Sequence, residues 1–225
     1  QENSQSSSFQ LEYQRLRQIL KHKQTWWNAL MGANCWAPIA IFELWGIPYL
    51  QQWHHCTTAE AGNAVLIMWL GIAIASPIVG YYSNRIKSRR KPLILCATIS
   101  IFASIAILHL PNQSWLFMYL SLFLLGCSAA AQPVTFALVS DHHPEKSIGT
   151  ATGFQNMAVI FGGPIFQPII GFLLHYYWDG SIVDHAPLYT LDCYKHALTI
   201  LPIFGLIGLL TSYFKIHETH CKNQY

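Results

Sequence analysis

The sequence predicts an all-α membrane protein with six transmembrane helices. Three observations predict this fold class: six long apolar segments, a low charge content and basic residues confined to one side. Charged residues make up 10% of the 225-residue chain and apolar residues 52%, whereas soluble domains contain about 25% charged residues. A soluble helical protein with apolar cores is the alternative, and six long segments with almost no charge argue against it.

Each segment is long enough to cross a bilayer, which takes about 20 mostly apolar residues. Tryptophan and tyrosine residues lie near the segment ends, as in the aromatic belts of membrane proteins; Trp26, Trp53, Trp115 and Trp178 are examples. The predicted spans are residues 26–50, 61–82, 92–110, 115–139, 149–177 and 194–214.

Basic residues fix the expected orientation. With six spans, all but one of the 13 Lys and Arg residues fall on the side that holds both termini, and only Lys195 lies opposite. Short basic loops stay cytoplasmic, so we expect both termini in the cytoplasm, in a bacterial inner membrane. The net charge of +3 is spread along this membrane face, so we expect no nucleic-acid partner. The basic residues of this side are Arg15, Arg17, Lys21, Lys23, Arg85, Lys87, Arg89, Arg90, Lys91, Lys146, Lys215 and Lys222.

We expect three parts: a cytoplasmic linker over 1–25, a six-helix bundle over 26–216 and a tail over 217–225. Residues 1–8 are polar and predict a flexible tether. Apolar residues then recur at helical spacing opposite basic ones, which predicts an amphipathic helix lying on membrane lipids. A plain solvated linker is the alternative. The apolar residues are Phe9, Tyr13, Leu16 and Leu20.

Polar residues are concentrated in the first, second, fourth and fifth spans, while the third and sixth contain few. Polar groups within the hydrocarbon generally face a bundle interior or a wet cavity. We therefore expect four helices to line an interior and two to face lipid, a pattern that repeats after three helices. The candidates for contact with a solute are Asn34, Gln132, Gln155, Asn156 and Gln167, with interhelical hydrogen bonds as the alternative role.

Glu43 is the one acidic residue deep inside a predicted span. It lies about 25 Å along the helix from Trp26, at 1.5 Å per residue, and hence in the outer half of the bilayer. Acids in membranes are costly, so a functional role is the default hypothesis. Glu43 is expected to carry a coupling proton or bind a cationic group, or else to form a structural hydrogen bond.

Small residues mark close contacts between helices. Gly149 and Gly153 form a G-x-x-x-G pair in the fifth span, followed by Gly162 and Gly163, and Gly71 lies on a narrow face of the second span. Small residues let helix backbones approach closely. These five glycines are therefore the predicted packing positions.

The segment GYYSNRIKSRRKPL at 80–93 resembles the signature loop of the major facilitator superfamily, G-x-x-x-D-R-x-G-R-R, in its degenerate second-half form. LWGIPYL in the first span and GTATGFQNM in the fifth also resemble the family. Gly80, Arg85, Arg89 and Arg90 match the loop motif, whereas Asn84 replaces the acid and Lys87-Ser88 stands where one Gly is usual.

This resemblance implies helices seven to twelve of a twelve-helix permease with the central cytoplasmic linker. The fold would be two three-helix repeats, one half of the family fold, and its partner would be an N-terminal six-helix half. The loop residues would help close the cytoplasmic side, with a weaker latch because Asn84 has no charge. Arg85 is expected to pair with an acid or with backbone carbonyls; alternatively, the basic loop residues only set topology. The glycine-rich second and fifth spans would contact the absent half, or else pack within this one.

The resemblance implies alternating-access transport of a small solute, with proton coupling as one hypothesis. A non-transporting scaffold or a channel subunit is the alternative. We expect no enzyme, because Walker, H-E-x-x-H and G-x-S-x-G motifs are absent from the sequence. The clustered histidines lack zinc-site spacing, so we expect no metal or cofactor. A bridge between Cys56 and Cys193, both in predicted outer loops, is left open.

Overall fold

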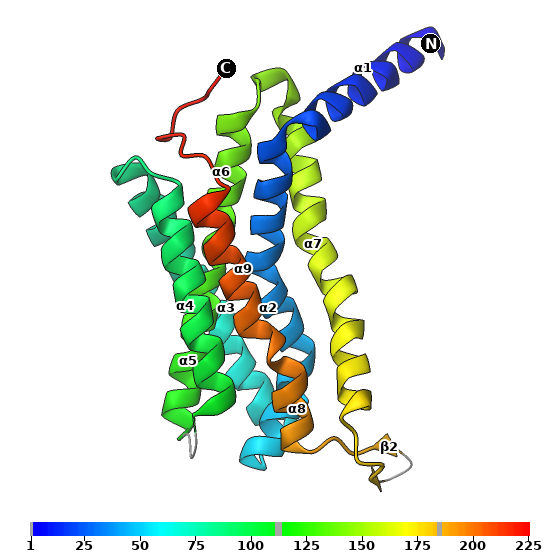
Figure 1. Cartoon of the computed structure of the whole chain (residues 1–225), viewed down its shortest axis with the longest axis vertical. Coiled ribbons are helices and arrows are strands. Elements are labelled where there is room, and N and C mark those ends of the chain that lie inside the picture. Colours follow the sequence, from blue (N-terminus) through cyan, green and yellow to red (C-terminus); the bar gives the residue numbers. More distant parts are fainter. Residues whose placement is uncertain (1, 111–113, 184–185) are drawn as a thin grey trace.

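In the computed structural model, the chain forms one bundle of six spans (Figure 1). The structure describes residues 2–110, 114–183 and 186–225. A helix, α1 (Glu2–Lys21), precedes the bundle and projects away from it (Figure 1). The spans are α2 (Lys23–His54), α3 (Thr58–Arg85), α4 (Arg90–His109), α5 (Trp115–Ala129) with α6 (Gln132–His142), α7 (Glu145–Tyr176), and α8 (Leu191–Leu198) with α9 (Ile200–Phe214). The predicted all-α class with six membrane helices is confirmed.

Both termini lie at one end of the bundle, which we call the terminal end (Figure 1). The α3–α4 and α6–α7 connections lie at this end too. The opposite end has a short ribbon of β1 (Ile182–Val183) paired antiparallel with β2 (Ala186–Pro187). This ribbon is an addition to the expected all-helical chain. Successive spans therefore run in opposite directions between the two ends of the bundle, as expected for a chain that crosses the membrane six times.

The helix pairing reveals two three-helix repeats. α2 packs chiefly against α7, α3 against α5, and α4 against α9. In span numbers, the first span pairs with the fifth, the second with the fourth and the third with the sixth. A rotation that exchanges the first three spans with the last three, in order, turns the first of these pairs into the second. The same rotation maps the third pair onto itself. Such a pattern is what a pseudo-two-fold axis between two three-helix units produces.

The helices extend past the apolar segments that predicted them. α2 begins at Lys23 and ends at His54, and α6 continues to His142. Polar residues beyond the hydrocarbon core still form helical hydrogen bonds, so hydropathy underestimates helix length. For the same reason α1 begins at Glu2, and the tether expected over 1–8 is helical from that residue.

Turn chemistry sets several helix ends. Thr57 and Glu60 form a capping box that begins α3: the Thr57 hydroxyl accepts from the Glu60 backbone N–H, and the Glu60 carboxylate accepts from the Thr57 N–H. At α8 the Thr190 side chain is the N-cap and accepts from the Cys193 N–H. Pro133 lies in the first turn of α6, just after the fourth span is interrupted at Ala130. A proline there lacks only an N–H that has no helical partner anyway.

Two glycines allow a close backbone contact between α3 and α5. A Cβ built on Gly126 of α5 would lie 1.9 Å from the Met68 carbonyl oxygen of α3, and one on Gly71 would lie 2.3 Å from the Phe123 carbonyl oxygen. Only glycine fits at both positions, so the α3–α5 pair depends on them. Gly71 was among the predicted packing positions, while Gly126 was not.

Candidate functional site

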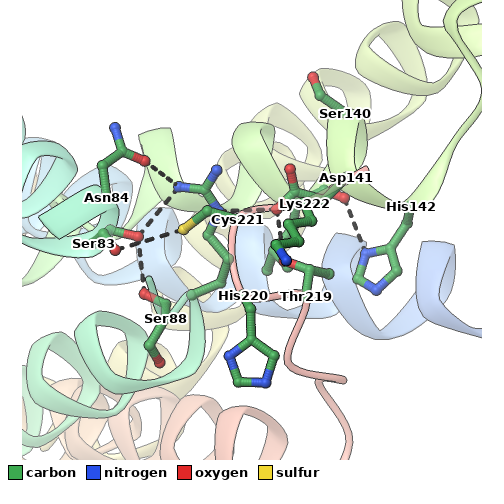
Figure 2. Close-up of polar contacts among 12 residues, drawn as sticks. Ser83, Asn84, Ser88, Ser140, Asp141, His142, Thr219, His220, Cys221 and Lys222 are labelled. Carbon is green, nitrogen blue, oxygen red and sulfur yellow. Dashed lines mark hydrogen bonds and ion pairs between the residues drawn. The ribbon is translucent and has the colours of Figure 1, made fainter. Parts of the chain in front are cut away.

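A buried ion pair and its hydrogen bonds join four parts of the chain at the terminal end. Arg89, just before α4, donates from Nε to Asp141 Oδ2 of α6 at 2.9 Å, and each side chain is 10% exposed. Arg89 Nη1 also donates to Asn84 Oδ1 at 2.9 Å and to Ser83 Oγ at 3.2 Å. Thr219 of the tail donates to the same Asp141 oxygen at 2.6 Å. Figure 2 shows Ser83 and Asn84 on one side of this arrangement and Asp141 and Thr219 on the other.

We call these five residues, Arg89, Asp141, Ser83, Asn84 and Thr219, the Arg89 network. Among the described residues the other ion pair is Arg15–Glu12, which lies within α1. A buried charge pair is tolerated when further hydrogen bonds satisfy it, as they do here. The network therefore ties α3, α4, α6 and the tail together at one end.

A second polar contact lies beside the network, at the start of α4. The Glu218 carboxylate of the tail accepts from the backbone N–H of Arg89 at 2.8 Å and of Arg90 at 3.1 Å, and from the Ser88 hydroxyl. Burial alone would raise the pKa of Glu218, but these donors and the His220 N–H hold the pKa below its usual value. A carboxylate here also benefits from the positive N-terminus of α4.

The other two arginines of the loop have different partners. Arg90 donates to the carbonyl oxygens of Ser212 and Tyr213, the last turn of α9, where a cation offsets the helix dipole. Arg85 is exposed and donates to the Tyr81 hydroxyl at 3.1 Å. The expected pairing of Arg85 with an acid or a carbonyl is therefore wrong. In the structure Arg89 has that role, because its side chain points back across the helix ends to Asp141.

The loop backbone explains why glycine is usual in the matching motif. Lys87 occupies the left-handed region with φ of 50°, which glycine adopts without steric cost. A non-glycine residue there costs on the order of 1–2 kcal/mol. The Cβ position of Gly80, in contrast, has no atom within 4 Å, so its environment within this bundle does not require glycine.

Three of the polar candidates within the spans make hydrogen bonds inside the bundle. Asn34 is buried and donates to the Leu30 carbonyl of its own helix at 2.8 Å. Gln155 is 1% exposed and donates to the Asn28 carbonyl and to the Thr135 hydroxyl. Gln167 donates to the Ala40 carbonyl at 3.0 Å. Gln155 and Gln167 therefore make the interhelical hydrogen bonds of the alternative role, whereas Asn34 bonds within its own helix.

The remaining candidates are more accessible. Glu43 and Asn156 are exposed on the bundle, and Gln132 is half-buried at the start of α6. Glu43 lies within a span, as expected, but its side chain is exposed on this bundle. Position within a span did not imply burial, because no other helix of this bundle covers that part of α2. Among the described residues the buried carboxylate is Asp141, in the last turn of α6.

A buried hydrogen-bond cluster between α2, α6 and α7 includes two residues that sequence reasoning missed, Asn28 and Thr135. Asn28 of α2 donates to the Thr135 carbonyl of α6 at 2.8 Å, and Gln155 of α7 bonds to both residues. A Cβ on Gly32 would lie 2.3 Å from Gln155 Nε2, so this glycine makes room for the glutamine. Their signal was present in the sequence: a polar residue in each of two apolar helices at similar depth.

The five predicted packing glycines divide into two groups. Gly71 contacts α5, and a Cβ built on Gly162 or Gly163 would lie 3.7 Å from the Ala37 Cβ or 3.6 Å from the Ala40 Cβ of α2. Gly149 and Gly153 have no atom within 4 Å of their Cβ positions. These two therefore do not pack against another described helix of this bundle.

Cysteine and histidine clusters form neither bridges nor metal sites in the described chain. All six cysteines are free; Cys193 Sγ contacts the Tyr177 carbonyl and Cys56 Sγ the Leu50 carbonyl. No group of three or more His, Cys, Asp or Glu residues is arranged to hold a metal within the described residues.

Comparison with known proteins identifies the family. The model of the Major Facilitator Superfamily matches residues 27–221, which covers most of the chain. The chain belongs to the Major Facilitator Superfamily. The predicted resemblance is confirmed, and the family and fold indicate a transporter rather than an enzyme.

Two relatives match part of this facilitator chain. It is 28% identical over 152 residues to "Tetracycline resistance protein, class E" of Escherichia coli, covering 67% of the chain and 33% of that protein. It is 26% identical over 159 residues to "Probable nitrate/nitrite transporter NarK2" of Mycobacterium tuberculosis, covering 69% and 39%. The matched chain thus spans well under half the length of these relatives.

A solved structure shares the fold of this facilitator chain. The proton:xylose symporter XylE, bound to 6-bromo-6-deoxy-D-glucose, aligns with a TM-score of 0.68 and 18% identity. The alignment covers 85% of this chain and 44% of that one. The six-span bundle therefore corresponds to somewhat less than half of a facilitator fold.

Proposed function

We propose that this chain is the second six-helix half of a secondary transporter that moves a small solute by alternating access. The observation that carries the proposal is the family match over residues 27–221, on a bundle equivalent to under half of a solved facilitator. In such transporters the solute site lies at the interface of the repeats near the bilayer midplane. The partner would be a first six-helix half, on the same or a separate chain.

The surface of the bundle supports a missing partner. α3 and α7 are the least buried of the six spans. α3 exposes an apolar stripe at four-residue spacing, formed by Leu66, Leu70, Ile74 and Ile78. Gly149 and Gly153 of α7 likewise have open Cβ positions. We infer that α3 and α7 pack against the other half, where open glycines permit close approach.

The terminal end would be the gate of this half. The Arg89 network and the Glu218 contact join four segments there, and twelve basic residues predict that this end is cytoplasmic. Cooperative loss of these hydrogen bonds would let α3, α4 and α6 separate at that end. We infer that the terminal end faces the cytoplasm of a bacterium and that its opening accompanies inward release of solute.

Glu43 and Asn156 are the proposed solute-facing residues, and Gln132 is a third candidate. Each is exposed or half-buried in this half, and Glu43 lies within a span. A carboxylate in a cavity that opens to alternating sides is suited to carrying a coupling proton. Tetracycline, nitrate and xylose, named for the similar proteins, are the first solutes to test.

The experiment compares reactivity at single cysteines in the protein in its native membrane. Glu43→Cys and Asn156→Cys should react with a water-soluble maleimide, whereas Leu95→Cys, exposed on α4, should not. If the chain is a non-transporting scaffold, none of the three cysteine variants should react. A channel predicts reaction together with ion conductance in planar bilayers, and a transporter predicts reaction without conductance.

A further inference from the structure

A groove of about 880 Å³ lies at the terminal end, between the start of α2, the end of α9 and the tail. We call it the terminal groove. Among its described lining residues Glu218 has the one acidic side chain, and this carboxylate already accepts bonds from Ser88 and the start of α4. Six lining side chains are basic or can become so: Lys21, His22, Lys23, His142, Lys215 and His217. The groove therefore has an excess of positive charge.

Two buried nitrogen atoms in the groove wall have no partner among the described residues. His142 is 6% exposed, and its Nδ1 lies 2.9 Å from the Leu138 carbonyl oxygen. A carbonyl only accepts, so Nδ1 donates, and Nε2 of the neutral ring is left as an unsatisfied acceptor. Nδ1 of His22, whose ring centroid lies 6.1 Å from that of His142, is also unsatisfied. Unpaired buried polar groups are costly.

The start of α2 adds a further attraction for an anion. His22 at its N-cap makes no side-chain capping bond, and the first turn contains no acid. Free N–H groups and the helix dipole at such an end favour negative charge. Trp27 and Phe214 line the same groove from the apolar spans, and Lys215 Nζ lies 5.1 Å from the Trp27 ring centroid.

We propose that the terminal groove binds a phosphate group, held by Lys21, Lys23 and Lys215 and by a proton shared between a phosphate oxygen and His142 Nε2. Nε2 is shielded from solvent, so a small ring rotation accompanies binding. Basic pockets between transmembrane helices bind lipid head groups in this manner, with Trp27 and Phe214 beside the acyl chains. A soluble phosphate offers the same chemistry.

Isothermal titration calorimetry of the full chain in a neutral detergent separates the two sources. The titrants are dihexanoyl phosphatidic acid, dihexanoyl phosphatidylcholine and inorganic phosphate. We expect phosphatidic acid to bind and phosphatidylcholine, with the same acyl chains, to bind at least tenfold more weakly. Binding of phosphatidic acid alone identifies a lipid head group as the ligand, while comparable binding of inorganic phosphate identifies a free phosphate. The proposal is overturned if neither phosphatidic acid nor inorganic phosphate binds, or if the two lipids bind equally well.

Two variants test the named contacts. The triple variant Lys21→Ala, Lys23→Ala and Lys215→Ala should bind roughly 100-fold more weakly, at about a fivefold loss for each lysine. The control triple Lys87→Ala, Lys91→Ala and Lys146→Ala removes the same charge outside the groove and should bind like wild type. Equal losses in both triples would show non-specific charge attraction and overturn the site.

His142→Phe isolates the shared proton. Titrations in buffers with different ionisation enthalpies measure proton uptake on binding. Wild type should take up protons at neutral pH, and His142→Phe should abolish that uptake and weaken binding. Unchanged uptake in a folded His142→Phe protein would remove His142 from the site.

Discussion

At the scale of single residues, the Arg89–Asp141 pair dominates the terminal end. Both side chains are 10% exposed, so removing one leaves the other as an uncompensated buried charge. We expect Asp141→Ala or Arg89→Ala to lower the free energy of unfolding by about 3–5 kcal/mol. Chemical denaturation of each variant in detergent measures this loss.

The double variant Arg89→Ala with Asp141→Ala serves as the control. It removes both charges together, so its loss should be well below the sum of the two single losses. Additive losses would show that the two residues stabilise the fold independently and that the pair is not a unit.

Glu43 is the residue for which a coupling role is predicted. Glu43→Gln keeps the shape and hydrogen bonding of the side chain but removes its titration. If Glu43 carries the coupling proton, the complete transporter should retain solute exchange and lose accumulation driven by a pH gradient. Uptake and exchange assays in proteoliposomes measure both. Full pH-driven accumulation by the Gln variant, at normal expression, would exclude this role.

The loop motif shows where sequence reasoning stops at this scale. It singled out Gly80, Asn84, Arg85, Arg89 and Arg90 as a group, and three of these take part in the contacts at the terminal end. It did not identify the partners, since Asp141 lies 52 residues and Glu218 129 residues from Arg89. Such partners depend on how the helix ends meet in space, which no local pattern encodes.

At the scale of elements, the glycines between α3 and α5 are tightly packed, whereas Gly149 and Gly153 of α7 have open space beside them. Gly126→Ala would place a methyl group against the Met68 backbone, which cannot move as a side chain can. We expect a loss of about 1–3 kcal/mol from overpacking. Gly149→Ala is the matched control: its Cβ has open space, and alanine favours the helix by about 1 kcal/mol.

Thermal unfolding in detergent measures both glycine variants. Gly126→Ala should lower Tm and Gly149→Ala should leave it unchanged or raise it. A lower Tm for Gly149→Ala in the 225-residue chain would mean that Gly149 does pack within this bundle. A loss confined to the complete transporter would support contact with the other half.

The helices themselves were predictable because their signal is local. Hydropathy placed all six spans, and polar and aromatic flanks explain why the helices run a few residues longer. The interruption at Ala130 and the close contact at Gly126 were not predicted. A glycine in an apolar helix faces either a neighbour or lipid, and only the packing of α3 on α5 distinguishes the two.

At the scale of the whole molecule, the orientation is predicted from the distribution of basic residues and is directly testable. Lys87 lies at the terminal end and Ser181 at the opposite end, and both are exposed. In a background with Cys56 and Cys221 replaced by serine, Lys87→Cys should react with an impermeant maleimide only from the cytoplasm, and Ser181→Cys only from outside. Labelling of intact cells and inverted vesicles reads out each side. The opposite pattern would reverse every assignment of gate and solute face.

Under the proposed function, the bundle on its own provides half of a transport pathway. Its α3 and α7 faces are the least buried, and its candidate solute residues Glu43 and Asn156 are exposed on the open bundle rather than enclosed. A solute site between two halves cannot close when one half is missing. The 225 residues reconstituted alone should therefore show no saturable uptake of tetracycline, nitrate or xylose under a pH gradient. Supplying the other half, fused or co-expressed, should restore saturable uptake if the proposal is right and the solute is the correct one. Saturable gradient-driven uptake by the 225 residues alone would contradict the half-transporter assignment.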